Sequence, residues 1–149
     1  MSFYLIAIVV AAADQLTKVW VRMHLEVGET LILWGREWTR YENSGMAGGL
    51  LQGYGRLFGA LAVLFVAGVL LYRKKEPRGL PVDCALGFLV GGAVGNGIDR
   101  LLFGQVTDFI VRSGGGILNV ADHAIELGVV LMALTLLVQW ARRKWSARQ

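Results

Sequence analysis

Long apolar stretches separated by short polar segments dominate this chain of 149 residues. Four of them, at about residues 2–21, 57–72, 82–102 and 121–140, approach the length of about 20 residues that a membrane-crossing helix needs. We therefore predict an α-helical membrane protein with four transmembrane helices, organised as one integral membrane domain over residues 1–149.

A polar and aromatic segment at about residues 25–55 separates the first two predicted helices. Residues 25–34 and 37–42 are rich in β-formers and predict two short strands, with Gly35 between them. Trp34, Trp38 and Tyr41 are residue types that settle at the level of lipid headgroups. We expect a small extracytoplasmic β-sheet or flap here, serving either as an interfacial anchor or as a substrate-binding platform.

Composition supports the membrane assignment. Only 17% of the residues are charged, against about 25% in soluble domains, and the mean hydropathy is +0.53. Many basic residues follow the second and fourth apolar stretches, an arrangement that suits the cytoplasmic face of a membrane and not a nucleic-acid groove. We predict that both clusters and both termini are cytoplasmic. The clusters are Arg73, Lys74, Lys75 and Arg78, and Arg142, Arg143, Lys144 and Arg148.

The first apolar stretch has one feature of a cleavable signal peptide, the small residues Ala11, Ala12 and Ala13. It lacks a basic start, and its polar residues continue the helical pattern. We expect it to remain as a membrane helix.

Glycines recur at four-residue spacing in the third predicted helix, at Gly87, Gly91 and Gly95. This spacing puts them on one helix face and lets a neighbouring helix approach closely.

Charged residues inside the predicted helices are the informative anomaly, because each costs about 2.5–3.5 kcal/mol on insertion scales. Asp14 and Lys18 have the (i, i+4) spacing of a helical ion pair, which is either a structural pair or a part of a site. Asn96 and Asp99 share a face near the outer end of the third helix. Arg100 follows them, and it could reach the interface, pair with Asp99 or contact a substrate.

Two further aspartates lie at the outer side. Asp108 is in the connection after the third helix, and Asp122 is at the start of the fourth. Alone, the first would be an ordinary loop residue and the second an ordinary helix cap. Because the outer ends of a four-helix bundle lie close together, both carboxylates can converge. Such a pair shares a proton, which is the requirement of aspartyl proteolysis.

Competing chemistries have weaker support. Ser44 and Ser113 have no obvious basic partner for nucleophilic catalysis. His123 and Asp122 could contribute to a metal site, but adjacent helical residues point about 100° apart. We expect no metal and no cofactor.

The polar motifs together resemble those of the bacterial lipoprotein signal peptidases (signal peptidase II). The matching motifs are Asp14-Gln15-Leu16-Thr17-Lys18, Asn43-Ser44-Gly45-Met46-Ala47, Gly95-Asn96-Gly97-Ile98-Asp99-Arg100, Val106-Thr107-Asp108-Phe109 and Asn119-Val120-Ala121-Asp122. The resemblance implies an aspartyl endopeptidase of the bacterial cytoplasmic (inner) membrane. Its substrates would be diacylglyceryl-modified prolipoproteins, and its active site would face the extracytoplasmic side.

The resemblance also implies roles for individual residues. Asp108 and Asp122 would be the catalytic pair, and Asn43, Arg100 and Asn119 would hold the substrate. Asp14, Lys18, Asn96 and Asp99 would support the site. The partners would be the substrate and membrane lipid, with no nucleic acid; the oligomeric state is left open.

This chain departs from the family pattern at Gly48, where an aromatic residue is usual, and at His123, where a small residue is usual. The segment containing Gly114, Gly115 and Gly116 replaces an aromatic-proline approach. These departures concern the fit of the substrate and remove no residue that the chemistry needs.

Two rival functions remain open at this point. A small transporter or channel could use intramembrane carboxylates, but its sites tend to lie near the membrane midplane between repeated halves. A non-catalytic relative could bind lipidated peptides; the intact aspartate pair argues against it.

Overall fold

The computed structural model describes residues 1–46, 50–75 and 79–147, with the side chain of Lys75 excepted. Some residues named above lie outside the described residues. They are Ala47 of the second motif, Gly48 after it, Arg78 of the first basic cluster and Arg148 of the second.

All four predicted helices are confirmed: α1 (Ser2–His24), α2 (Gly55–Lys75), α3 (Leu80–Phe103) and α4 (Val120–Ser146). Each is long and apolar enough to cross a membrane. Each also extends beyond its predicted bounds, most clearly α4, because the helix does not end where the apolar run ends. The basic residues after Trp140 are good helix formers and are favoured at a helix C-terminus.

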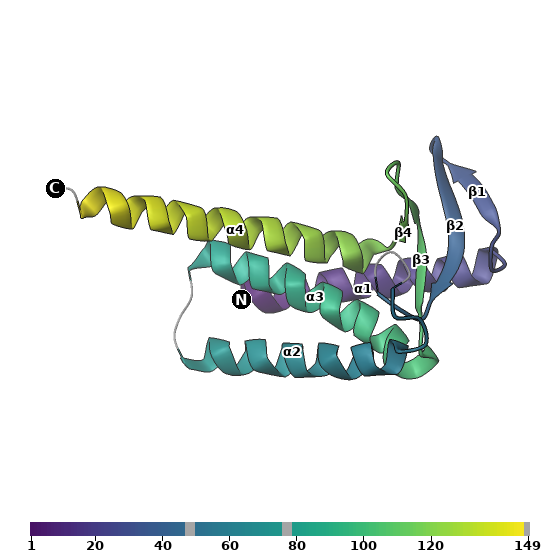
Figure 1. Cartoon of the computed structure of the whole chain (residues 1–149), viewed down its shortest axis with the longest axis horizontal. Coiled ribbons are helices and arrows are strands. Elements are labelled where there is room, and N and C mark those ends of the chain that lie inside the picture. Colours follow the sequence, from purple (N-terminus) through teal and green to yellow (C-terminus); the bar gives the residue numbers. More distant parts are fainter. Residues whose placement is uncertain (47–49, 76–78, 148–149) are drawn as a thin grey trace.

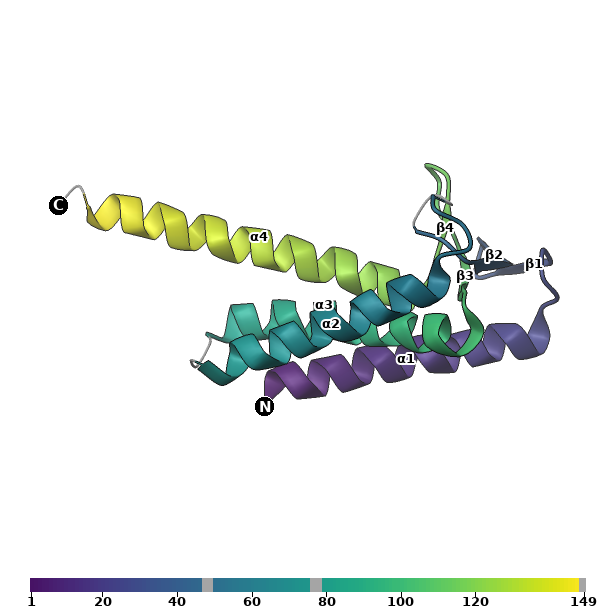
Figure 2. The same ribbon diagram turned by 60° about the horizontal axis from the view of Figure 1, so that its bottom comes forward.

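Helix α3 lies at the centre of the bundle and packs against the other three helices (Figures 1 and 2). Half of the most apolar segment of α3 is buried inside the protein, against 11% of the corresponding segments of α2 and α4. The glycine face predicted for it packs against α1. A Cβ atom added at Gly91 would lie 2.7 Å from the Val10 Cβ and 2.9 Å from the Ala7 carbonyl oxygen. The prediction of a close helix contact is therefore confirmed.

The sheet differs from its prediction. It has four antiparallel strands in the order β1-β2-β3-β4. Strands β1 (Thr30–Leu33) and β2 (Arg36–Asn43) come from the α1–α2 connection, and β1 is shorter than expected. Trp34 and Gly35 both have positive φ and form the two-residue turn between them.

Strands β3 (Val106–Val111) and β4 (Ile117–Leu118) come from the α3–α4 connection, for which the sequence predicts only a loop. Its residues 106–111 are mostly β-formers, but a lone short run does not indicate a strand until a partner strand is known. The sheet thus joins the α1–α2 and α3–α4 connections, whose paired residues are more than sixty positions apart in the chain.

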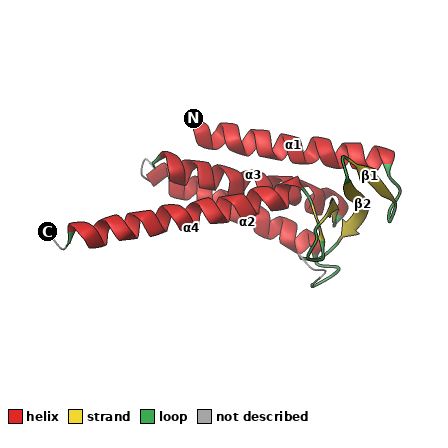
Figure 3. Cartoon of the chain, turned by 90° about the horizontal axis from the view of Figure 1, so that it is seen from above, coloured by secondary structure: helices red, strands yellow, loops and turns green. Residues whose placement is uncertain are grey.

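The sheet covers one end of the bundle (Figures 1 and 3). Phe109 of β3 is fully buried against Val21 and Leu25 at the end of α1, and Trp38 of β2 stacks on its ring at a centroid distance of 5.2 Å. Helix α1 begins, α2 ends, α3 begins and α4 ends at the opposite end of the bundle.

Candidate active site

The start of α4 positions Asp122. Asn119 is the N-cap residue, and its side-chain oxygen accepts a hydrogen bond from the Asp122 backbone N–H at 2.9 Å. In return, the Asp122 carboxylate accepts one from the Asn119 backbone N–H at 3.1 Å. Asparagine is a preferred N-cap residue, and this reciprocal arrangement is a capping box.

Strand β3 positions Asp108 beside the same asparagine. The side-chain amide of Asn119 donates to Asp108 Oδ1 at 2.6 Å. The side-chain amide of Asn43, the last residue of β2, donates to Asp108 Oδ2 at 3.1 Å. The structure therefore brings together the aspartates of β3 and α4, with Asn119 in contact with both.

Asp108 is only 3% exposed, and burial raises its pKa to about 7. The negative charge of Asp122 acts in the same direction, while the amide donors Asn43 and Asn119 act against it. A carboxyl with this pKa holds a proton for much of the time near neutral pH. The pair can therefore present one acid and one base to a substrate.

Asn96 of α3 connects the pair to the interior of the bundle. Its side-chain amide nitrogen donates to Asp122 Oδ1 at 2.8 Å. Its oxygen accepts from the Lys18 ammonium at 2.9 Å and from the Asn119 side chain at 3.1 Å. All of its side-chain hydrogen-bonding atoms are thus directed to residues of the site.

The residues Asp14, Lys18, Asp99 and Arg22 form an ion-pair cluster below the aspartate pair. Lys18 Nζ lies 2.7 Å from Asp14 Oδ2 and 3.1 Å from Asp99 Oδ2, and all three side chains are fully buried. Arg22 lies 3.4 Å from the other Asp99 oxygen. Asp14 Oδ1 accepts from the backbone N–H of Ala121 at 2.9 Å, which fixes the first turn of α4 against α1. The predicted ion pair of Asp14 with Lys18 is confirmed.

Arg100 does not take the alternative of pairing with its neighbour Asp99, which points to Lys18 and Arg22 instead. Consecutive helical residues do not face each other, which explains the difference. The partly buried Arg100 side chain donates from Nη2 to the carbonyl oxygen of Gly45 at 3.2 Å. Its buried Nε has no hydrogen-bond partner among the described residues.

Three residues of this region received no role from the sequence: Arg22, Glu42 and Thr107. The Thr107 hydroxyl lies 3.0 Å from Arg22 Nη1 and 3.1 Å from Glu42 Oε2. A signal for Arg22 was present, since it follows Lys18 by four residues and so lies on the same face of α1. Glu42 and Thr107 meet only through the pairing of β2 with β3.

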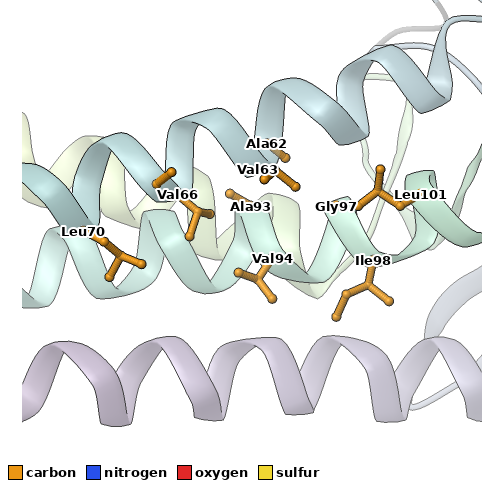
Figure 4. Close-up of a pocket in the computed structure, with 10 residues that line it drawn as sticks. Ala62, Val63, Val66, Leu70, Ala93, Val94, Gly97, Ile98 and Leu101 are labelled. Carbon is orange, nitrogen blue, oxygen red and sulfur yellow. The ribbon is translucent and has the colours of Figure 1, made fainter.

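Two cavities lie beside α2. One, of about 370 Å³, is lined by apolar side chains and by Asn96 and Arg100, and so borders the site. The other, of about 270 Å³, is lined only by apolar residues of α2 and α3, such as Val66 and Val94 (Figure 4). Only the first has the polar residues of the site at its border.

The neighbours of His123 do not form a metal-binding group. Its ring Nδ1 lies 3.3 Å from Glu126, and both side chains are exposed. Within residues 1–46, 50–75 and 79–147, no three His, Cys, Asp or Glu side chains are placed to bind one metal ion.

Comparison with known proteins identifies the family. A sequence model described as signal peptidase (SPase) II matches residues 6–138. A lipoprotein signal peptidase of Listeria welshimeri is 36% identical, with 97% of this chain and 98% of the relative covered. The corresponding protein of Shouchella clausii is 38% identical over 97% and 99%, and that of Brevibacillus brevis is 40% identical over 90% and 93%.

Solved structures agree with the sequence comparison. A bacterial membrane enzyme determined by the in meso method at 2.3 Å resolution superposes with a TM-score of 0.86, at 30% identity, over 94% of this chain and 90% of that one. A second, at 1.9 Å resolution, has a TM-score of 0.81 at the same identity. With a family match over residues 6–138 and relatives at 36–40% identity, the chain belongs to the signal peptidase II family of membrane aspartyl endopeptidases.

Proposed function

We propose that the chain removes signal peptides from diacylglyceryl-modified prolipoproteins at the extracytoplasmic face of the cytoplasmic membrane, with Asp108 and Asp122 as the catalytic pair. The relatives named lipoprotein signal peptidases support the reaction class and the prolipoprotein substrate. One observation carries the assignment of the pair: the side chain of Asn119 binds Asp108 while its backbone N–H binds Asp122.

The different surroundings of the two carboxyls support distinct roles. Asp108 is the more buried, and its raised pKa makes it the member that holds the shared proton. Asp122 is less buried and accepts hydrogen bonds from Asn96 and from the Asn119 backbone, so its carboxylate is placed to take a proton from water. Asp122 is therefore the general base and Asp108 the general acid.

The proton transfers and bond changes of the reaction follow from these roles. Asp122 takes a proton from water as the water oxygen bonds to the scissile carbonyl carbon, and Asp108 gives its proton to the carbonyl oxygen. The tetrahedral intermediate then collapses: the carbon–nitrogen bond breaks, the leaving amine takes the proton from Asp122, and a hydroxyl proton returns to Asp108. The pair ends with one shared proton, as it began.

The surrounding polar residues divide into two groups. Asn43 and Asn119 have their amide groups bound to Asp108, so they hold the carboxyl in place. Their predicted contact with substrate stays a prediction. Arg100 has an unpartnered Nε, borders the cavity of about 370 Å³ and lies beside Gly45, so it is suited to bind a carbonyl oxygen of the substrate.

Cleavage of a defined precursor tests the proposal. Purified protein in detergent is incubated with a diacylglyceryl-modified prolipoprotein, and release of the signal peptide is scored by mass spectrometry. The matched control is the same precursor without the diacylglyceryl group. We expect cleavage of the lipidated form only. Absence of cleavage of the lipidated form refutes the proposed reaction, and equal cleavage of both refutes the lipid requirement.

The location of the site requires its own experiment. Single cysteines replace Lys74, at the end of α2, and Gly115, between β3 and β4, in a Cys84→Ser background. An impermeant thiol reagent applied to spheroplasts should label the Gly115 variant and leave the Lys74 variant unlabelled. The reverse labelling would place the aspartates at the cytoplasmic face and contradict the proposed location.

A further inference from the structure

The residue before Asp108 is held as firmly as Asp108 itself. Thr107 is fully buried in β3, and strand alternation directs its side chain to the face opposite that of Asp108. On that face its hydroxyl donates to Glu42 Oε2 at 3.1 Å and accepts from Arg22 Nη1 at 3.0 Å. Its backbone N–H faces Asp99 Oδ2 at 3.4 Å.

The side-chain hydrogen bonds of Thr107 join three elements, β3, β2 and α1. Glu42 comes from β2, directly opposite Thr107 in the β2–β3 register, and Arg22 comes from the last turn of α1. Arg40 of β2 lies 2.9 Å from Glu42 and also donates to the carbonyl oxygen of Leu25 at 2.8 Å. The contacts thus continue the ion-pair cluster out of the bundle and into the sheet.

The geometry of the aspartate pair, Asp108 and Asp122, depends on where the sheet lies on the helices. Asp122 is fixed within α4 by its capping box, and α4 is fixed to α1 by the bond from Ala121 to Asp14. Asp108 belongs to a strand, so its distance from Asp122 is set by how β3 rests on the helices. The Thr107 hydroxyl links β3 to α1 and to β2 by hydrogen bonds. These bonds lie on the face of the strand opposite the aspartate pair.

We propose that Thr107 and Glu42 are positioning residues for cleavage: they hold β3 on the end of α1 so that the Asp108 carboxyl meets Asp122 in reactive geometry. The side-chain hydrogen bonds of both residues go to Arg22, to Arg40 and to each other, and not to the aspartate pair. The inference rests on the proposed pairing of Asp108 with Asp122. It gives a function to contacts on the far side of the strand.

The test uses Thr107→Val, which keeps the branched shape of the side chain and removes only its hydroxyl. A small displacement of a reacting group costs up to about 100-fold in rate. We expect kcat for the lipidated precursor to fall about 10- to 100-fold with KM within about twofold of wild type. Thr107→Ser, which restores the hydroxyl, should recover most of the loss.

The matched control is Thr30→Val on the same sheet. Thr30 shares a hydroxyl hydrogen bond of 2.8 Å with Thr39, exposed and remote from the aspartates, so this variant should keep wild-type kcat. A role in folding alone would lower the thermal midpoint of Thr107→Val and leave kcat per folded molecule unchanged, which would overturn the inference. A raised KM with unchanged kcat would also overturn it, since it would indicate substrate contact.

Glu42→Gln extends the test if Thr107→Val does not fold in detergent. The amide oxygen can still accept from Thr107, but the charge opposite Arg22 and Arg40 is lost. We expect reduced kcat with unchanged KM; wild-type kcat refutes the positioning role. Failure of the wild-type protein to cleave the precursor would instead refute the proposed function, so the two failures are distinguishable.

Discussion

Two sets of carboxylates lie at the sheet end of the bundle, and their partners differ. In the ion-pair cluster, Asp14 and Asp99 directly contact the ammonium of Lys18. In the aspartate pair, the groups that contact Asp108 and Asp122 are neutral amides, from Asn43, Asn96 and Asn119. The first set has its charge compensated within contact distance, and the second has not.

This difference in partners suits the aspartates of the ion-pair cluster to a structural role and those of the aspartate pair to the proposed catalytic role. Carboxylates that share one buried cation are tied to it and to each other, so they hold the helices that carry them together. Two carboxylates with only neutral donors compete for one proton. The structure thus places the ion-pair cluster next to the aspartate pair and connects the two sets through Asn96. Four predictions test this comparison.

Replacement of either member of the pair should have the largest effect. Asp108→Asn and Asp122→Asn keep the size of the side chain but cannot exchange the proton. Because residues acting as a unit lose nearly everything when one is removed, each single variant and the double variant should lose activity by about 10⁴-fold or more. The thermal midpoint in detergent should stay near that of wild type. Substantial cleavage by either variant would contradict the aspartyl mechanism.

Removal of the cation from the ion-pair cluster should instead affect folding. Lys18→Met leaves Asp14 and Asp99 buried without their shared partner. Breaking a buried pair in this way costs about 3–5 kcal/mol, which denaturant unfolding in detergent would measure. If the variant unfolds like wild type but has lost all activity, Lys18 has a catalytic role and not a structural one.

The pH dependence should follow Asp108. Its folded-state pKa of about 7 lies above the ordinary aspartate value of 3.8, so the folded state binds this proton more tightly than the unfolded state does. The resulting stabilisation is full below the unfolded pKa and is lost as the pH rises through about 7. For activity, kcat/KM should fall about tenfold per pH unit above that value. The stability change should be absent in Asp108→Asn, and a wild-type stability independent of pH over this range would be inconsistent with a raised pKa.

The smallest effect should come from the exposed ion pair near the site. Arg112 lies 2.8 Å from Glu126, and both side chains are about half exposed, at 57% and 47%. Glu126→Gln should change the free energy of unfolding by less than about 1 kcal/mol, and His123→Ala should keep substantial cleavage. Loss of activity in His123→Ala would show that the imidazole takes part in the reaction and does not merely lie beside Asp122.

Much of the helical architecture could be predicted from the sequence alone. The apolar lengths determine four membrane helices, because backbone groups in lipid must be satisfied within each helix. The spacing of Asp14 and Lys18 determines their ion pair, and the spacing of Gly87, Gly91 and Gly95 determines a close helix contact. These features follow from helical periodicity, which is local and visible in the chain.

The tertiary structure alone decided the sheet and the partners of the polar residues. Strand β3 became recognisable only when β2 paired with it, because strand hydrogen bonds are made to residues distant in sequence. The same pairing put Glu42 opposite Thr107 and Asn43 beside Asp108. Asp99 pairs with Lys18 and not with the adjacent Arg100 for a similar reason. Sequence neighbours on a helix point in different directions, so which charges meet depends on how the helices pack.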